Sequence, residues 1–318
     1  MDKYPVEDIF KELPHVNHAE KALVEKAYHF AVKAHEGQAR KSGEPYFVHV
    51  YETAKNLARY SMDATTIAAG FLHDVLEDTE VSEEQMTAEF GEEITELVKG
   101  VTKLGRVKYR GQIRHVESLR KFLIALAKDH RILMIKLADR LHNLRTLEHV
   151  RKDKRERIAL ESIEVYAPLA DRLGIGRLKG EIEDAAFPYA YPKEYASVSD
   201  LLAGHADTIQ SSLDCVFIKL KNELAKHPIT VHGIDHRIKH KYSLYRKLKK
   251  YDMHIENIYD IVALRVIVET VEECYAVLGI IHSIWRPLPG RIKDYIALPK
   301  LNGYQSLHTT IFTGQGGI

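Results

Sequence analysis

The chain has little cysteine and no long apolar run, and each absence excludes a class of protein. Its two cysteines, Cys215 and Cys274, lie far apart and form no C-x-x-C pair, so neither a disulfide framework nor a zinc knuckle is predicted. No apolar run approaches the roughly 18 residues of a membrane-spanning helix, and no charged-then-apolar leader opens the sequence. We therefore expect a cytoplasmic protein that makes no membrane contact.

Net charge is also nearly absent. The formal charge is +1, with 29% charged residues, which argues against wholesale affinity for nucleic acid or membranes. A G-x-G at Gly174-Ile175-Gly176 lacks a third glycine and a preceding strand, so it does not indicate a dinucleotide-binding turn, and no G-x-x-x-x-G-K-[ST] occurs. What remains is 318 residues with 45% hydrophobic content, typical of a soluble globular protein with two domains.

The most informative stretch is 72–79, LHDVLEDT, in which His73 and Asp74 precede the carboxylates Glu77 and Asp78. The apolar residues before it predict a largely buried helix that carries the motif at its C-terminal end. At about 100° per residue, Glu77 lies one turn beyond His73, and Asp78 one turn beyond Asp74, so all four side chains can face one pocket. An adjacent His-Asp pair also arises on solvated helix faces, so a metal site needs further ligands.

Two further candidate ligands, His49 and Asp139, lie in apolar surroundings. In the segment 136–147, leucines form one stripe, while Asp139, Asn143 and Thr146 form a polar stripe about half a turn away. This pattern favours a helix that faces a ligand, with a surface helix of mixed polarity as the alternative. Two His and two Asp suit Mn²⁺, Fe²⁺ or Zn²⁺ better than Ca²⁺.

These residues resemble the HD superfamily of metal-dependent phosphohydrolases, whose ligand pattern is H…HD…D. The words RKSGEPY, HDVLEDT and KLADRLHNLRTL are similar to the hydrolase half of the RelA/SpoT homologue family, which makes and destroys the alarmone (p)ppGpp. The resemblance implies an Mn²⁺-dependent (p)ppGpp 3′-pyrophosphohydrolase of the stringent response that releases pyrophosphate and GDP or GTP. It assigns the metal to four ligands: His49, His73, Asp74 and Asp139.

The resemblance also suggests roles for the remaining polar residues. Glu77 and Asp78 are expected to aim a water molecule and take its proton. Five residues are expected to contact the nucleotide: Arg40, Lys41, Ser42, Asn143 and Thr146. From the residues alone, the loop at 40–43 is equally a solvated turn. The stretch 103–114, rich in Lys and Arg, either screens an anionic substrate or is merely a solvated loop.

From about residue 196 the pattern changes. Two prolines within 185–192 mark the junction. The elements expected beyond it are a long helix over 199–226, a strand buried on both faces over 258–268, a helix over 271–282 and a strand over 305–312. We therefore predict an α + α/β protein: an all-helical HD-type phosphohydrolase domain over 1–195 and a partial, mixed-sheet α/β nucleotidyltransferase-like synthetase domain over 196–318.

The basic segment 237–250 fits either a solvated helix or a polyphosphate-binding site. Asp260, alone in an apolar strand, favours the polyphosphate-binding site because a buried acid needs a metal or a base. This block resembles the family's synthetase, and the word K-x-N-G-Y-Q-S-x-H implies that Tyr304 stacks on guanine. The implied ATP-phosphate contacts are Arg237, Lys239, Ser243 and Lys247, with Mg²⁺ on Asp260. The implied acceptor-nucleotide contacts are Lys300, Asn302, Tyr304, Gln305 and His308.

The sequence departs from the family pattern at its end. A strand with the word E-x-Q-I-R-T, which carries a catalytic glutamate, follows this point in the family, whereas this sequence stops at Gly316-Gly317-Ile318. We expect a fragment whose second domain does not synthesise (p)ppGpp. The word RIKD at 291–294 matches bifunctional members. Expected partners are ppGpp, pppGpp, GDP, GTP and ATP, without direct nucleic-acid contact. The alternative is a guanine-nucleotide-binding regulatory module without turnover; a general HD nucleotidase would not explain the NGYQSLH word.

Overall fold

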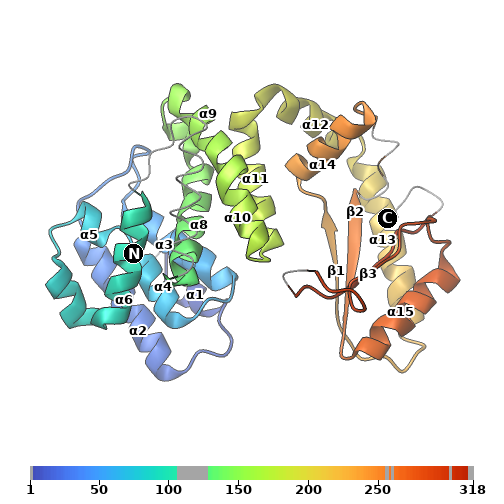
Figure 1. The fold of residues 1–318 in the computed structure, drawn as a ribbon, viewed down its shortest axis with the longest axis horizontal. Helices are drawn as coiled ribbons and strands as arrows, with labels where there is room; N and C mark the ends of the chain where they lie inside the picture. Colours follow the sequence, from blue (N-terminus) through green and yellow to red (C-terminus); the bar gives the residue numbers. More distant parts are fainter. Residues whose placement is uncertain (1–2, 106–127, 255–257, 259–260, 301–302, 314–318) are drawn as a thin grey trace. The chain divides into compact units, whose positions relative to one another are not determined.

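A computed structural model describes the chain except for residues 1–2, 106–127, 255–257, 259–260, 301–302 and 314–318 (Figure 1). Two compact units make up the chain, Met1–Tyr166 and Ala167–Ile318. The boundary predicted near residue 195 lies within the second unit and stays a prediction about the functional domains. Among the described residues, none of the helices combines the length and apolar character needed to cross a bilayer.

Apart from an isolated β-bridge between Ala39 and Pro45, the regular elements among the first unit's described residues are helices, as the sequence predicts. Its elements are α1 (Glu7–Phe10), α2 (His18–Ala34), α3 (Phe47–Arg59), α4 (Ala64–Leu72), α5 (Val75–Asp78), α6 (Glu83–Gly105), α8 (His130–Arg145), the 3-10 helix η1 (Leu147–His149), α9 (Lys152–Glu161) and the π-helix η2 (Ser162–Tyr166). Helix α2 begins at a capping box formed by Asn17 and Glu20, and Asp63 caps α4 through the Thr66 amide. Gly91, with φ of 81°, divides α6.

Helix α4 lies at the centre of this unit. All but one of its residues are buried, and it packs against α2, α3 and α6. A Cβ atom at Gly70 would lie 2.5 Å from Cδ1 of Leu57 and 3.5 Å from Cα of Ala54, so glycine lets α3 approach α4 closely. This approach places the middle of α3 beside the C-terminal end of α4.

The second unit begins with helices and continues with short strands. Its elements are α10 (Ala167–Arg172), α11 (Gly176–Ala190), α12 (Pro192–Gly204), α13 (Ala206–Leu224), β1 (Val231–Ile238), α14 (Lys241–Leu248), the 3-10 helix η3 (Lys249–Tyr251), β2 (Val262–Val268), α15 (Val271–Ile284), β3 (Lys293–Asp294) and β4 (Leu307–His308). The described strands form two antiparallel pairs, β1 with β2 and β3 with β4. Helices followed by a small sheet is the predicted order of elements.

Two details of the second unit differ from the sequence-based prediction. The strand β2 is not buried on both faces: Ala263, Arg265 and Ile267 are exposed, while the alternate residues face a core built from α13 and α15. An antiparallel pair commonly covers one face and leaves the other in water, which produces this alternation. The helix predicted over 199–226 ends at Gly204 and restarts at Ala206, so it is two helices.

Helix α14, the basic segment after β1, docks onto α11. Asp184 on α11 accepts hydrogen bonds from the Tyr242 amide at 2.9 Å and from Nδ1 of His240 at 2.8 Å. The His240 ring lies directly on Gly180, where a Cβ atom would come within 2.2 Å of the ring atom Cδ2. The start of α14 is therefore fixed by a carboxylate cap and by a glycine that leaves room for the ring.

We expect Gly180→Ala to lower the free energy of unfolding by about 1–3 kcal/mol, because the added methyl group overlaps the His240 ring. Gly279→Ala is the matched control, since its Cβ would meet open space within α15, and there alanine should stabilise by about 0.5–1 kcal/mol. Chemical denaturation measures both changes. Equal effects of the two substitutions would show that the His240 ring does not need the space at Gly180.

Candidate metal centre

The four predicted ligands come from three parts of the first unit and meet at one point. His49 lies on α3, Asp139 on α8, and His73 and Asp74 between α4 and α5. His49 Nε2 is 3.3 Å from Asp74 Oδ2 and 3.3 Å from Asp139 Oδ1, and His73 Nε2 is 3.2 Å from Asp74 Oδ2. The ligand atoms of His49, His73 and Asp74 all lie within 4.8 Å of one another. Atoms that share one ion at about 2.1 Å lie at such separations.

The protonation of His73 suits a metal ligand. Its Nδ1 lies 2.8 Å from the Gly70 carbonyl oxygen, which can only accept, so Nδ1 carries the hydrogen. Nε2 is fully buried, has no hydrogen-bond partner and faces Asp74 Oδ2, so a cation placed between these two atoms could take its lone pair. A carbonyl that holds the outer nitrogen while the inner one faces carboxylates is the arrangement found around metal-bound histidines.

His49 is arranged in the same way. Its Nδ1 lies 2.8 Å from Nδ1 of His142, and that atom also faces the Arg40 guanidinium, 3.3 Å away. Because Arg40 can only donate, His142 Nδ1 is the acceptor and His49 Nδ1 carries the hydrogen. His49 Nε2 is therefore the ring nitrogen that points at Asp74 and Asp139. The donor set, two imidazoles and two carboxylates, fits a divalent cation such as Mn²⁺ or Zn²⁺.

The charges of the two carboxylates are stabilised by neighbouring side chains. Burial raises the pKa of Asp139, but the Lys136 ammonium, 2.6 Å from Oδ2, outweighs it and holds that pKa well below its usual range. Asn143 donates to the other oxygen, Oδ1. Burial also raises the pKa of Asp74, but the facing histidines His73 and His49 more than offset it. Both carboxylates are thus ionised and ready to bind a cation.

His142, a residue that the motifs did not single out, is buried and neutral. Burial, with the charges of His49 and Arg40, lowers the pKa of His142 to about 3. It lies one turn after Asp139 on α8, so helical spacing from a predicted ligand is the signal that could have found it. Lys136, one turn before Asp139, could have been found by the same rule.

The pKa of His142 predicts a pH dependence of stability. Because this pKa is lower in the folded chain than the value of about 6.5 expected when unfolded, the unfolded chain binds more protons between pH 6.5 and pH 3. The stabilisation from His142 is therefore fully present above pH 6.5 and is lost as pH falls toward 3. As pH is lowered from 6.5 toward 3, the free energy of unfolding of the metal-free protein should decrease more steeply than that of His142→Asn, by up to about 1.4 kcal/mol per pH unit. Equal slopes of unfolding free energy against pH in the two proteins would contradict this.

Of the five predicted nucleotide contacts, three lie together beside the metal ligands. Arg40 donates from Nη2 to Asn143 Oδ1 at 2.5 Å and from Nη1 to Thr146 Oγ1 at 3.3 Å. Lys41 is exposed, and Ser42 bonds within its own loop, to Glu44. The loop at 40–43 therefore reaches α8 through its arginine.

The predicted catalytic carboxylates lie on α5, next to the ligands. Glu77 and Asp78 are both exposed, and Asp78 Oδ2 lies 2.6 Å from the hydroxyl of Tyr46, which is also 2.7 Å from Asp74 Oδ2. Burial and the Asp74 charge raise the pKa of Tyr46, so the phenol stays protonated. Tyr46 was not predicted as a site residue; its position one turn before His49 on an apolar helix was the available signal.

In the second unit, three predicted residues of the acceptor site come together. Lys300 Nζ lies 4.8 Å from the ring centroids of Tyr295 and Tyr304, and the Tyr304 hydroxyl is 2.9 Å from His308 Nε2. Tyr304 remains 43% exposed, which leaves ring area for a base to stack on. Gln305 is exposed beside it.

The predicted phosphate-binding residues lie in β1, in α14 or between them. Ser243 and Lys247 lie one turn apart on α14, and Ser243 donates to the buried Glu183 at 3.5 Å. The main chain of Arg237 is in β1, and the Lys239 amide bonds to the Ile261 carbonyl oxygen at 2.8 Å. Asp260 and Asn302 lie outside the described residues, as does most of the basic stretch 103–114.

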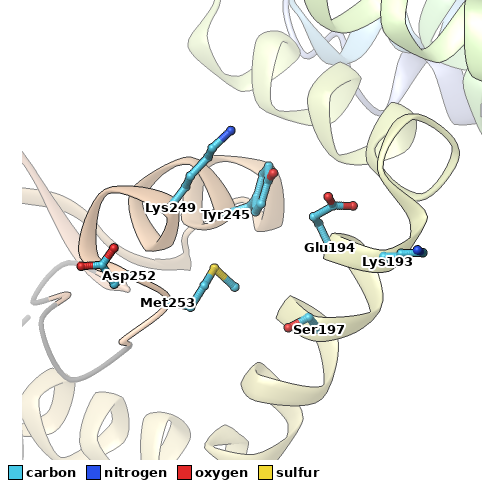
Figure 2. A pocket seen from close by; sticks show the side chains of 7 residues that line it. All are labelled: Lys193, Glu194, Ser197, Tyr245, Lys249, Asp252 and Met253. Atoms are coloured by element: carbon cyan, nitrogen blue, oxygen red, sulfur yellow. The ribbon is translucent and has the colours of Figure 1, made fainter.

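A cavity of about 560 Å³ lies on another side of α14. Figure 2 shows Tyr245 and Lys249 on one of its walls and Glu194 and Ser197, from α12, on the other. None of the predicted nucleotide contacts lines it.

Two known families match this chain. The family described as HD domain matches residues 27–176, and the family described as a region found in RelA / SpoT proteins matches residues 236–318. The first match contains all four candidate metal ligands. The second contains every residue predicted for the synthetase.

Curated relatives are similar over almost the whole chain. A guanosine-3′,5′-bis(diphosphate) 3′-pyrophosphohydrolase of Aquifex aeolicus is 46% identical over 98% of this chain and 44% of its own length. A GTP pyrophosphokinase of Streptomyces coelicolor is 47% identical over 92% of this chain and 34% of its own length. A bifunctional (p)ppGpp synthase/hydrolase SpoT of Escherichia coli is 44% identical over 92% and 42%. The chain thus spans less than half the length of these relatives.

Proposed function

Because the chain belongs to the RelA/SpoT family, with an HD domain followed by a RelA/SpoT region, we propose that its first unit is a metal-dependent (p)ppGpp 3′-pyrophosphohydrolase. The observation that carries this proposal is the convergence of two buried imidazole nitrogens, His49 Nε2 and His73 Nε2, on the carboxylates of Asp74 and Asp139. Relatives named as 3′-pyrophosphohydrolases support the choice of substrate.

The four ligands would hold one Mn²⁺ ion, which when bound supplies a Lewis acid that polarises water and the pyrophosphate. Glu77 and Asp78 take the proton of the attacking water. In the balanced reaction, the water oxygen bonds to the phosphorus attached to O3′ while the bond from that phosphorus to O3′ breaks. O3′ gains a proton, and the products are GDP or GTP and pyrophosphate.

Arg40 would move from its hydrogen bonds with Asn143 and Thr146 to the nucleotide, or share them with it. Its guanidinium offers a planar set of donors suited to phosphate, and it lies at the ligand cluster already. Lys41, exposed on the same loop, would add a second cation, with Ser42 as a hydroxyl donor. The loop thus orients the substrate while the metal ligands face its pyrophosphate.

For the second unit we propose the binding of ATP and a guanine nucleotide. Arg237, Lys239, Ser243 and Lys247 would hold the ATP phosphates, with Mg²⁺ on Asp260, and Lys300, Asn302, Tyr304, Gln305 and His308 would hold the acceptor. The cluster of Lys300, Tyr304 and His308 supports this. The alternative for this unit is a module that binds nucleotides without turnover. Measuring nucleotide binding together with the transfer of labelled phosphate from ATP to GDP separates a synthetase from such a module. We still predict that residues 1–318 alone do not synthesise (p)ppGpp. We also predict a cytoplasmic location.

Incubating the chain with Mn²⁺ and ppGpp tests the proposal for the first unit. The expected products are GDP and pyrophosphate, and a chelator should stop their release. Release of orthophosphate would indicate a different phosphohydrolase, and binding without any product would favour the regulatory alternative.

A further inference from the structure

A closed network of side chains connects the end of α2 with Asp78. His35, which follows α2 and is only 2% exposed, stacks on the Tyr46 ring with centroids 4.8 Å apart and an interplanar angle of 20°. The Tyr46 hydroxyl contacts the Asp78 carboxylate. On the other side, His35 Nδ1 lies 2.8 Å from Oε1 of Gln38, and Gln38 Nε2 donates to the Asp78 carbonyl oxygen at 2.7 Å.

The hydrogen positions in this network follow from the chemistry of its ends. The Asp78 carbonyl oxygen can only accept, so the Gln38 atom that faces it is the amide nitrogen, and the atom that faces His35 is the amide oxygen. His35 Nδ1 is therefore the donor. Burial lowers the pKa of His35, so the ring is neutral and stacks on Tyr46 without bringing a charge toward the carboxylates.

Asp78 needs such a support. It is exposed and closes α5, a helix of four residues, where an unrestrained side chain would sample several rotamers. A proton acceptor works efficiently only if it is held in the productive geometry, because ordering it during the reaction costs conformational entropy. Tyr46 contacts the Asp78 side chain, and Gln38 contacts its main chain.

We propose that His35 is a positioning residue for hydrolysis, which fixes Asp78 through two connections, the stacked Tyr46 ring and the Gln38 amide. This inference rests on the proposed hydrolase function of the first unit. His35 touches no reacting atom in this scheme and contacts none of the four metal ligands directly, while the Tyr46 hydroxyl reaches both Asp78 and the ligand Asp74. Its removal should therefore change turnover while leaving metal binding intact.

Two substitutions that break the same connection provide the test. His35→Phe keeps a ring on Tyr46 but loses the Nδ1 donor, and Gln38→Leu removes the acceptor and the bond to Asp78. Each should lower kcat by about tenfold, the effect of losing one aligned hydrogen bond, with KM and Mn²⁺ affinity changed less than about twofold. The double variant should be no slower than either single variant, because both act on one connection. His29→Phe, at an exposed position on α2, is the matched control and should leave kcat unchanged.

A readout without turnover separates this inference from the proposed function. Carbon-13 NMR of the aspartate carboxyl groups, with the Asp78 signal assigned from Asp78→Asn, should show that signal shifted in His35→Phe and unshifted in His29→Phe. A shifted Asp78 signal in a chain that releases no pyrophosphate would retain the link from His35 to Asp78 and reject the hydrolase. Additive losses of kcat in the double variant, or an Asp78 signal that does not shift in His35→Phe, would overturn the inference.

Discussion

Replacing His73 with alanine is expected to abolish Mn²⁺ binding and to lower ppGpp hydrolysis by about 10³-fold or more, since metal ions contribute several kcal/mol to transition-state stabilisation. His73 offers a buried Nε2 whose orientation is fixed by the Gly70 carbonyl oxygen. The variant loses this nitrogen and leaves Asp74 with one imidazole fewer. Isothermal titration with Mn²⁺ and an assay of pyrophosphate release should lose signal together.

His29→Ala is the control for this substitution, because His29 is exposed on α2 and lies outside the predicted site. It should keep both metal binding and turnover. Retained hydrolysis in His73→Ala, with Mn²⁺ still bound at wild-type affinity, would show that the metal does not use this histidine.

Glu77→Gln is expected to spare Mn²⁺ binding and to lower turnover by about 10²-fold, the usual contribution of a general base. Both Glu77 and Asp78 are exposed on α5 beside the ligands, so neither substitution leaves a buried polar group without a partner. Asp78→Asn is the companion variant, because it also loses the carboxylate that Tyr46 contacts. Rapid-quench measurement of the cleavage step compares the two.

The outcome assigns the proton acceptor. Full activity in Glu77→Gln with a large loss in Asp78→Asn would give the role to Asp78 alone. Full activity in both variants would contradict the assignment of a carboxylate base on α5.

Part of the candidate metal site could be predicted from the sequence because helical geometry is local. The adjacent pair His73 and Asp74 marked the motif, and the polar stripe on α8 made Asp139 a candidate ligand. The grouping of His49 with them depended on a resemblance, since its distance from α4 is set by the close approach of α3 at Gly70.

The supporting residues were not predictable in the same way. His35 reaches Asp78 only through Tyr46 and Gln38. Such roles depend on tertiary contacts and on the tautomers of buried rings, which sequence periodicity does not report. In the second unit, the strongly apolar composition of β2 suggested burial on both faces, but antiparallel pairing with β1 leaves one face in water.

The central claim is that one metal ion, held by His49, His73, Asp74 and Asp139, supports removal of the 3′-pyrophosphate. Adding Mn²⁺ stepwise to the metal-free chain, with ppGpp labelled only in its 3′-diphosphate, tests this most directly. We expect label to appear as pyrophosphate, with the rate rising in parallel with Mn²⁺ bound and reaching its maximum at one ion per chain. Label released as orthophosphate, or a rate that does not depend on bound Mn²⁺, would contradict the account.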